Sequence, residues 1–181
     1  MIFPRFRRKL RPDTISALYG MIVAQARMPC FYREYAVADT VNGRFDLIVL
    51  HLALALDRLF RDATLRALGQ GVFDLFCQDM DRNLREMGIG DLGVPKHMRR
   101  MGEAYYGRAQ AYRDAIAADD PVMLAEAVER NIYGGAHAPE AVQLAGYMRE
   151  AVRDLAAQDS ADLADGAMHF PDPLQCFKTI L

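Results

Sequence analysis

The chain has 181 residues, of which 52% are hydrophobic and 25% charged, and its formal net charge is −2. This composition is typical of one globular domain with a substantial core. Its charge provides no overall positive field, so we expect no DNA partner. The three cysteines (Cys30, Cys77 and Cys176) are scattered and odd in number. They indicate a reducing, cytoplasmic location and no disulfide framework.

The first eleven residues form a basic arm that contains no acid. The formal charge of −2, less the +5 of this arm, leaves −7 for the rest of the chain. The arm lacks the apolar core of a secretory signal. It suits contact with an anionic membrane surface or with ribosomal RNA, and a solvated terminal tail accounts for it equally well. Its cations are Arg5, Arg7, Arg8, Lys9 and Arg11.

Helical periodicity predominates along the chain, and strand signals are nearly absent. A first helix is predicted from about Asp13 to Arg27, where Met28-Pro29 ends it. Residues 31–38 are predicted to form a short helical turn and an extended arm. A long helix from Val41 to about Leu68 is apolar nearly all round, so we expect it at the centre of the fold. Its most apolar stretch has ten residues, against the ~20 that a membrane-spanning helix needs.

Further helices are predicted at about 70–88, 95–118, 121–133, 138–158 and 160–168. The expected fold is all-α, a single-domain bundle of six to seven helices around a buried central helix. Its expected divisions are a basic arm (1–12), a helical domain (13–173) and a C-terminal tail (174–181). A glycine inside the fourth long helix, Gly107, predicts a close helix–helix crossing.

The central helix carries one polar line: Arg44, His51, Arg58 and Asp62 are spaced seven, seven and four residues apart. They project in nearly the same direction among apolar neighbours, where an unpaired charge is costly. One interpretation pairs them with carboxylates of an adjacent helix, such as those of Asp79 or Glu86. The other exposes part of the line in a cleft that receives a polar group of a partner.

The segment Asp79–Asp91 is the densest run of short polar groups in the chain. Its acids fit the first positions of a calcium loop, but Leu84 replaces the turn glycine and Gly90 the bidentate glutamate. Periodicity instead predicts the end of an amphipathic helix capped by Gly88. A metal-dependent enzyme using Asp79, Asp81, Glu86 and His51 remains the alternative. No Glu or second His lies three or four residues from His51, as a carboxylate-bridged metal site would require.

The fourth long helix begins with a basic patch, Lys96, His97, Arg99 and Arg100. Cations at this end oppose the helix dipole, which suggests an external anionic partner. Elsewhere the sequence has no nucleophile elbow, phosphate loop or dinucleotide fingerprint. We therefore predict no catalytic residues, no metal and no cofactor.

Three long, ordered motifs connect this sequence with a known family. They are QAR-x-P-x-FYREY at 25–35, DT-x-x-GRFD at 39–46 and D-x-D-x-x-LREMG-x-GD at 79–91. Over about residues 13–173 the chain resembles the ubiquinol–cytochrome c chaperone family. It lacks a mitochondrial presequence of the usual length and so resembles the compact bacterial members.

The resemblance implies an all-helical assembly factor of the respiratory cytochrome bc complex. Mitochondrial members act on newly made cytochrome b near the ribosome and the inner membrane, together with a small partner subunit. The family has no agreed catalytic residues.

We therefore expect a non-enzymatic chaperone that binds cytochrome b or another component of the cytochrome bc complex. Its expected location is cytoplasmic, with peripheral contact at the inner face of the membrane. A module that binds a membrane or ribosome surface through the basic arm is a further alternative. The residues expected to contact the partner are Arg27, Arg33, Asp39, Arg44, His51, Arg58, Asp79, Asp81, Arg85, Glu86, Asp91, Lys96, Arg99 and Arg100.

Overall fold

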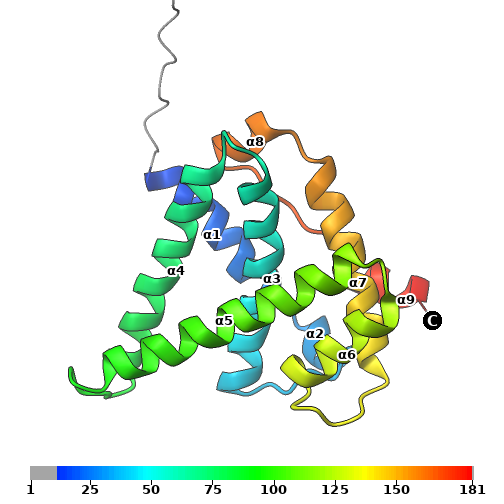
Figure 1. Ribbon diagram of the computed structural model, residues 1–181, viewed down its shortest axis with the longest axis horizontal. Helices are drawn as coiled ribbons and strands as arrows, with labels where there is room; N and C mark the ends of the chain where they lie inside the picture. The colour runs from blue at the N-terminus through cyan, green and yellow to red at the C-terminus, as the bar shows by residue number, and fades with distance from the viewer. Residues whose placement is uncertain (1–11, 181) are drawn as a thin grey trace, which may run out of the picture.

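Residues 12–180 are described by the computed structural model, and they form nine helices and no β-strand (Figure 1). The predicted all-α class is confirmed. The basic arm lies outside the described residues. The helices are α1 (Pro12–Ala26), α2 (Cys30–Arg33), α3 (Val41–Arg61), α4 (Arg66–Glu86), α5 (Val94–Ala117), α6 (Pro121–Ile132), α7 (Glu140–Ala157), α8 (Ser160–Asp165) and α9 (Pro173–Ile180).

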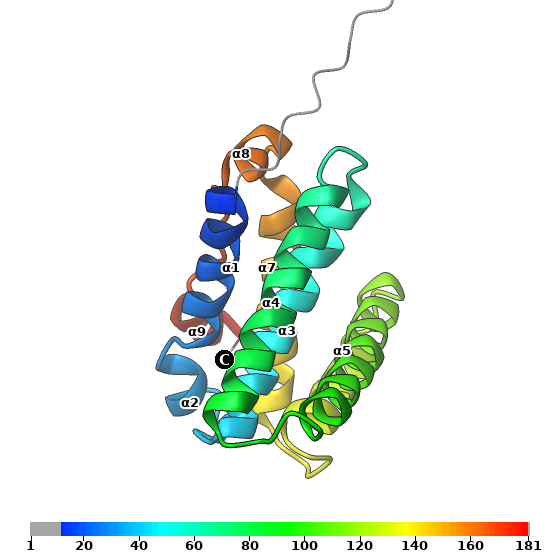
Figure 2. The same cartoon turned by 90° about the vertical axis from the view of Figure 1, so that its left-hand side faces the viewer.

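Helix α3 is the centre of the structure, as its sequence predicts. Every residue from Leu47 to Leu56 is buried, and α1, α4, α5 and α7 all pack against this helix. Figure 2 shows α1 and α5 on opposite sides of the α3–α4 pair. Within residues 12–180, no helix combines the length and the apolar character needed to cross a bilayer.

The start of α3 explains the DT-x-x-GRFD motif. The Thr40 hydroxyl accepts a hydrogen bond from the Gly43 amide at 3.1 Å and caps the helix. A Cβ atom on Gly43 would lie 2.0 Å from the Ala38 carbonyl oxygen, so only glycine fits. Arg44 Nε reaches Asp39 Oδ1 at 2.7 Å across the same turn. The motif therefore fixes how the chain enters its central helix.

The end of α3 comes earlier than the apolar pattern predicts. Asp62 leaves the helical conformation, and its Oδ1 accepts hydrogen bonds from the Thr64 amide and hydroxyl at 2.8 and 2.7 Å. This local side-chain bonding competes with helix continuation. The predicted helix 41–68 is thus divided into α3 and the first residues of α4.

Tyrosines apart, His51 is the one polar side chain that is fully buried among the described residues. Its Nδ1 lies 2.8 Å from the Leu47 carbonyl oxygen, which can only accept, so Nδ1 carries the proton. Nε2 then accepts from the Tyr147 hydroxyl at 2.9 Å, and the Tyr147 oxygen accepts from Gln25 Nε2 at 3.0 Å. The chain of bonds connects α3, α7 and α1, and burial lowers the pKa of His51 to about 4.

The C-terminal segment is a packed helix, so the prediction of a tail at 174–181 is wrong. The Tyr35 hydroxyl donates to the Pro173 carbonyl at 2.7 Å, and the Tyr35 and Phe177 rings meet edge to face at 5.1 Å. Helix α9 packs on α7 and α2. The described residues contain nine helices instead of the six to seven predicted, because α2 forms a separate short helix and α9 replaces the expected tail.

Gly107 does not mark a helix crossing. A Cβ atom built on it would meet no atom within 4 Å, because this face of α5 is open. The prediction of a close crossing there is wrong, and Gly107 provides a control for Gly43.

We expect Gly43→Ala to destabilise the protein by about 1–3 kcal/mol, because the new methyl group collides with backbone. Gly107→Ala should instead stabilise it by about 0.5–1 kcal/mol through helix propensity. Urea unfolding of both variants measures the two effects. Equal changes in the free energy of unfolding for the two variants would contradict the packing described at Gly43.

The buried His51 predicts a pH dependence of stability. The unfolded chain takes up a proton as pH falls through the ordinary pKa of 6.5, whereas the folded protein resists until about 4. Stability should therefore be highest above pH 6.5 and decrease by up to about 3 kcal/mol as pH falls to 4.

His51→Gln keeps one donor and one acceptor but does not titrate. The titration of the carboxyl groups affects the wild type and the variant equally. The difference in unfolding free energy between the two proteins therefore reports the titration of the His51 imidazole alone. This difference should shrink between pH 7 and pH 4.5. A difference that stays constant over this range would show that His51 is not held neutral.

Candidate functional site

The members of the polar line of α3 all have partners in the protein, Arg44 on the surface with Asp39, but not the partners that the sequence suggests. Arg58 Nε donates to the Leu155 carbonyl at 3.0 Å. A terminal Arg58 nitrogen donates to the Gln158 carbonyl at 2.9 Å and to the Ser160 hydroxyl at 3.1 Å. Arg58 thus caps the C-terminal end of α7, where carbonyls lack helical partners. Arg58 thus has partners within the protein, but they are two carbonyls and a hydroxyl, and the expected pairing with carboxylates of an adjacent helix, Asp79 or Glu86, is wrong.

Asp62 completes the line at its far end. It accepts a hydrogen bond from Ser160 Oγ at 2.6 Å as well as the two from Thr64. Hydrogen bonds from Ser160 and then Thr64 lower the pKa of this carboxyl to about 2. His51 has no exposed surface, and Arg58 is occupied with α7. His51 therefore cannot touch a partner directly, and the hydrogen-bonding atoms of the half-buried Arg58 are already used within the protein.

The end of α4 joins α1 through a buried hydroxyl. Tyr19 donates to Asp79 Oδ2 at 2.9 Å, and desolvation together with this bond raises the pKa of Tyr19. Asp79 therefore has a structural role between the two helices. One turn further along α4, Asn83 and Glu86 are exposed to solvent.

Arg85 organises the rest of the Asp79–Asp91 segment. Its Nε lies 2.6 Å from Asp81 Oδ2, the helical ion pair expected from the spacing. A terminal nitrogen of the same guanidinium contacts Asp91 in the loop that follows. Arg85 thus ties the loop back to the helix.

The residues of the alternative metal site do not meet. His51 is bound to Leu47 and Tyr147, Asp79 to Tyr19, and Asp81 to Arg85. Among residues 12–180, no group of three His, Cys, Asp or Glu side chains is placed to hold a metal ion. The metal-enzyme constellation is therefore not assembled by this fold.

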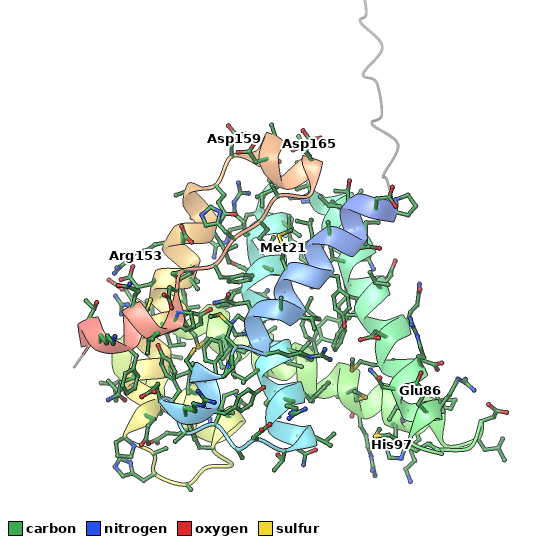
Figure 3. All side chains as sticks on the ribbon, turned by 180° about the vertical axis from the view of Figure 1, so that it is seen from behind. Met21, Glu86, His97, Arg153, Asp159 and Asp165 are labelled. Atoms are coloured by element: carbon green, nitrogen blue, oxygen red, sulfur yellow. The ribbon has the colours of Figure 1, made fainter. Side chains whose placement is uncertain are left out.

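Several predicted contact residues gather at one end of the molecule. The end of α1, the helix α2, the start of α3 and the end of α4 lie together there (Figures 1 and 3). We call the exposed charged residues at this end, together with Asp79, the polar edge. Its members are Arg27, Arg33, Asp39, Arg44, Asp79, Asp81, Arg85, Glu86 and Asp91.

The basic patch adjoins the polar edge at the start of α5. In Figure 3, Glu86 and His97 lie at the same corner of the molecule. Arg99 Nε reaches Glu103 at 3.7 Å, whereas Lys96 and Arg100 form no ion pair with any residue in the range 12–180. These two cations remain available to an external anion.

A pocket of about 500 Å³ opens where α4 and α5 leave α3. We call it the aromatic pocket. Buried side chains of α3 form its floor, and its wall and rim come from all three helices. The residues that define it here are Leu56 and Asp57 of α3, Gln70 and Phe73 of α4, and Tyr106 and Arg113 of α5.

The wall of the aromatic pocket is a cluster of packed rings. The Phe73 ring lies 5.0 Å from that of Tyr105 and 5.9 Å from that of Tyr106. Tyr106 remains 63% exposed, and Phe60, also in the pocket, 39% exposed. At the rim, Asp57 lies 3.7 Å from Arg113.

The sequence does not predict this pocket. Apolar periodicity assigns Phe73 and Tyr105 to a core stripe, which the structure confirms in part, but periodicity cannot show that two helices diverge. The available signal is that Phe60 and Tyr106 fall beside their helices' main apolar stripes. Two bulky aromatics left over in this way indicate a surface that is incompletely covered.

Comparison with known proteins is consistent across sequence and structure. The sequence matches the family described as ubiquinol-cytochrome C chaperone over residues 33–170. It is 26% identical over 149 residues to ubiquinol-cytochrome-c reductase complex assembly factor 1 of Xenopus laevis, covering 81% of this chain and 74% of that protein. It also resembles the crystal structure of the Cbp3 homolog from Brucella abortus, with a TM-score of 0.85 and 38% identity, over 97% of this chain and 99% of that one.

The family match covers well over half of the chain, and the fold agrees with a solved relative over nearly its whole length. The resemblance carried by the three motifs is thereby confirmed. This chain belongs to the ubiquinol-cytochrome C chaperone family.

Proposed function

We propose that this protein is a non-enzymatic assembly factor that binds cytochrome b, or another component of the cytochrome bc complex, before the complex is complete. Membership of the chaperone family supports the proposal, as does similarity to a protein named as an assembly factor of that complex. We place the protein in the cytoplasm, with peripheral contact at the inner face of the membrane. The basic arm, Arg5 to Arg11, is a further proposed contact with membrane or ribosome and lies outside the described residues.

The aromatic pocket is the observation that carries the proposal. Its volume of about 500 Å³ lies within the usual range for binding sites and has room for a few side chains of a partner. Leu56 on its floor is 1% exposed, so the floor belongs to the rigid core. Tyr106 and Phe60 on the wall retain the exposed apolar area that a partner can bury.

An apolar helical segment of the client matches this site best. Helices bind such grooves through side chains spaced three and four residues apart. Before assembly, a membrane subunit such as cytochrome b exposes such segments, which need cover in water. The charged rim, Asp57 and Arg113, limits the contact to a short stretch and keeps it reversible.

The polar edge is our proposed second contact, for loops of the client. Its exposed charges, together with Lys96, Arg99 and Arg100, present both signs over a surface held in place by the Tyr19–Asp79 and Arg85 contacts. His51 and Arg58, which we expected to contact the partner, instead hold α3 to α7, and we assign them no contact with the client.

Tyr106→Asp places a carboxylate in the wall of the aromatic pocket. We expect the full-length variant to retain at least about 30-fold less client, the equivalent of about 2 kcal/mol lost at an aromatic hot spot. Recovery of cytochrome b with the tagged protein from detergent-solubilised membranes measures the effect. Thermal unfolding should change little, since Tyr106 is 63% exposed.

Val122→Asp is the matched control, because Val122 is 64% exposed and lies on α6, outside the pocket. It should bind the client normally. Equal recovery of cytochrome b with both variants would remove the aromatic pocket from the client site.

Glu86→Lys tests the polar edge without disturbing a bond, since no described residue pairs with Glu86. We expect client binding to weaken about threefold to fivefold, with an altered salt dependence, because rim charges contribute roughly 1 kcal/mol or less. Glu126→Lys on α6 is the control, since Glu126 makes only a 4.0 Å contact with Arg130. If the two variants assemble the complex equally well, the polar edge is not a contact surface.

A further inference from the structure

The corner between α4 and α5 presents apolar side chains to solvent. Leu92 is 100% exposed, the highest value among the exposed large hydrophobic residues, and Met87 is 59% exposed. Figure 3 shows this corner projecting from the body, with Glu86 and His97 beside it. We call residues 87–100 the α4–α5 tip.

The tip is ordered, so Leu92 is held outward by structure. The Ile89 amide donates to the Leu84 carbonyl at 3.1 Å, and the Gly93 amide to the Gly90 carbonyl at 2.7 Å. Val94, two residues after Leu92, is 2% exposed and anchors the loop in the body. The fold therefore leaves the apolar side chains of Met87 and Leu92 uncovered at one corner, and their exposed area is available to a partner.

The charges around the tip indicate what it contacts. Of the nearby acids, Asp81 and Asp91 both pair with Arg85, whereas Glu86 is exposed and has no ionic partner among residues 12–180. Lys96 and Arg100 have no ionic partner among residues 12–180, and Lys96 lies in the first turn of α5, at the positive end of its dipole. The exposed leucine thus lies between Asp91, which pairs with Arg85, and cations that are available to an external anion.

The charge of the tip differs in sign from that of the chain without its basic arm. Without its first eleven residues the chain has a formal charge of −7, whereas the tip, residues 87–100, carries three cations and one acid, a net of +2. The tip therefore suits contact with an anionic surface better than this part of the chain does on average. The start of α1 lies at the end of the molecule opposite to the tip (Figure 1).

We propose that the α4–α5 tip is a peripheral membrane-contact site for anionic lipid. Leu92 and Met87 insert at the boundary between headgroups and acyl chains, while Lys96 and Arg100 lie against lipid phosphates. Shallow apolar insertion combined with cations is the ordinary mode of interfacial binding. The inference gives Lys96 and Arg100 an anionic partner besides the proposed client, and lipid vesicles without the client test it separately.

The chain contains no tryptophan, so Leu92→Trp introduces a unique fluorophore at the tip. With vesicles of phosphatidylcholine and phosphatidylglycerol, its emission should shift to the blue and be quenched by brominated acyl chains. Vesicles of phosphatidylcholine alone should give no shift. Val142→Trp on α7, at a site 58% exposed, is the control and should respond to neither.

Sedimentation with the same anionic vesicles tests the charges in the full chain. Lys96→Gln and Arg100→Gln should each weaken binding about fivefold, and added salt should reduce the difference. Lys178→Gln on α9 should bind as the wild type does. The proposal is overturned if Leu92→Trp shows no shift, or if Val142→Trp shifts equally. It is also overturned if the Gln variants lose cytochrome b while binding vesicles normally, which would make the tip a protein contact.

Discussion

The structure depends on burying ten consecutive residues of one helix, Leu47 to Leu56, from every side. Such a helix needs neighbours all round, and α1, α4, α5 and α7 supply them. His51 is the only member of the stretch with polar side-chain atoms, and it is satisfied by Leu47 within the helix and by Tyr147 from α7. A misplaced α7 would leave the imidazole without its second partner, so this contact selects one arrangement of the bundle. Gln25 of α1 donates to Tyr147, so the same chain of hydrogen bonds also fixes the position of α1.

This central burial also creates the aromatic pocket. Helices α4 and α5 both pack on α3, but they leave it in different directions, as Figure 2 shows. Where they diverge, α3 still contributes apolar side chains, and the space above them is bordered by Phe73 and Tyr106 instead of being filled. A binding site formed in this way has a rigid floor without any dedicated loop. Rigidity suits a binding protein, because little conformational entropy is lost when the partner arrives.

Local sequence patterns predicted what local forces decide. The start of α3 at Val41 and its place at the centre of the fold follow from the apolar residues on all sides of this helix. The ion pair of Asp81 with Arg85 follows from their spacing of four.

The partners of Arg58 could not be predicted, because they are backbone carbonyls about a hundred residues away and any sequence provides carbonyls. The helix at 173–180 was missed because its order comes from packing on Tyr35 and α7 more than from its own eight residues. The aromatic pocket was missed because hydrophobic periodicity describes the faces of a single helix and does not show where two helices diverge.

The placement of unsatisfied groups separates scaffold from function in this molecule. Inside, Arg58, His51, Asp62 and Tyr19 each have partners in the protein, so their substitution acts first on stability. Outside, Tyr106, Leu92, Lys96 and Glu86 expose apolar area or charge that the fold itself does not use. A chaperone needs this division, since it must hold a client without reacting with it and then release it. Weak, separate contacts on a rigid bundle meet both requirements. Together they hold the client firmly, and the loss of any one contact lowers the overall affinity for the client enough to permit release.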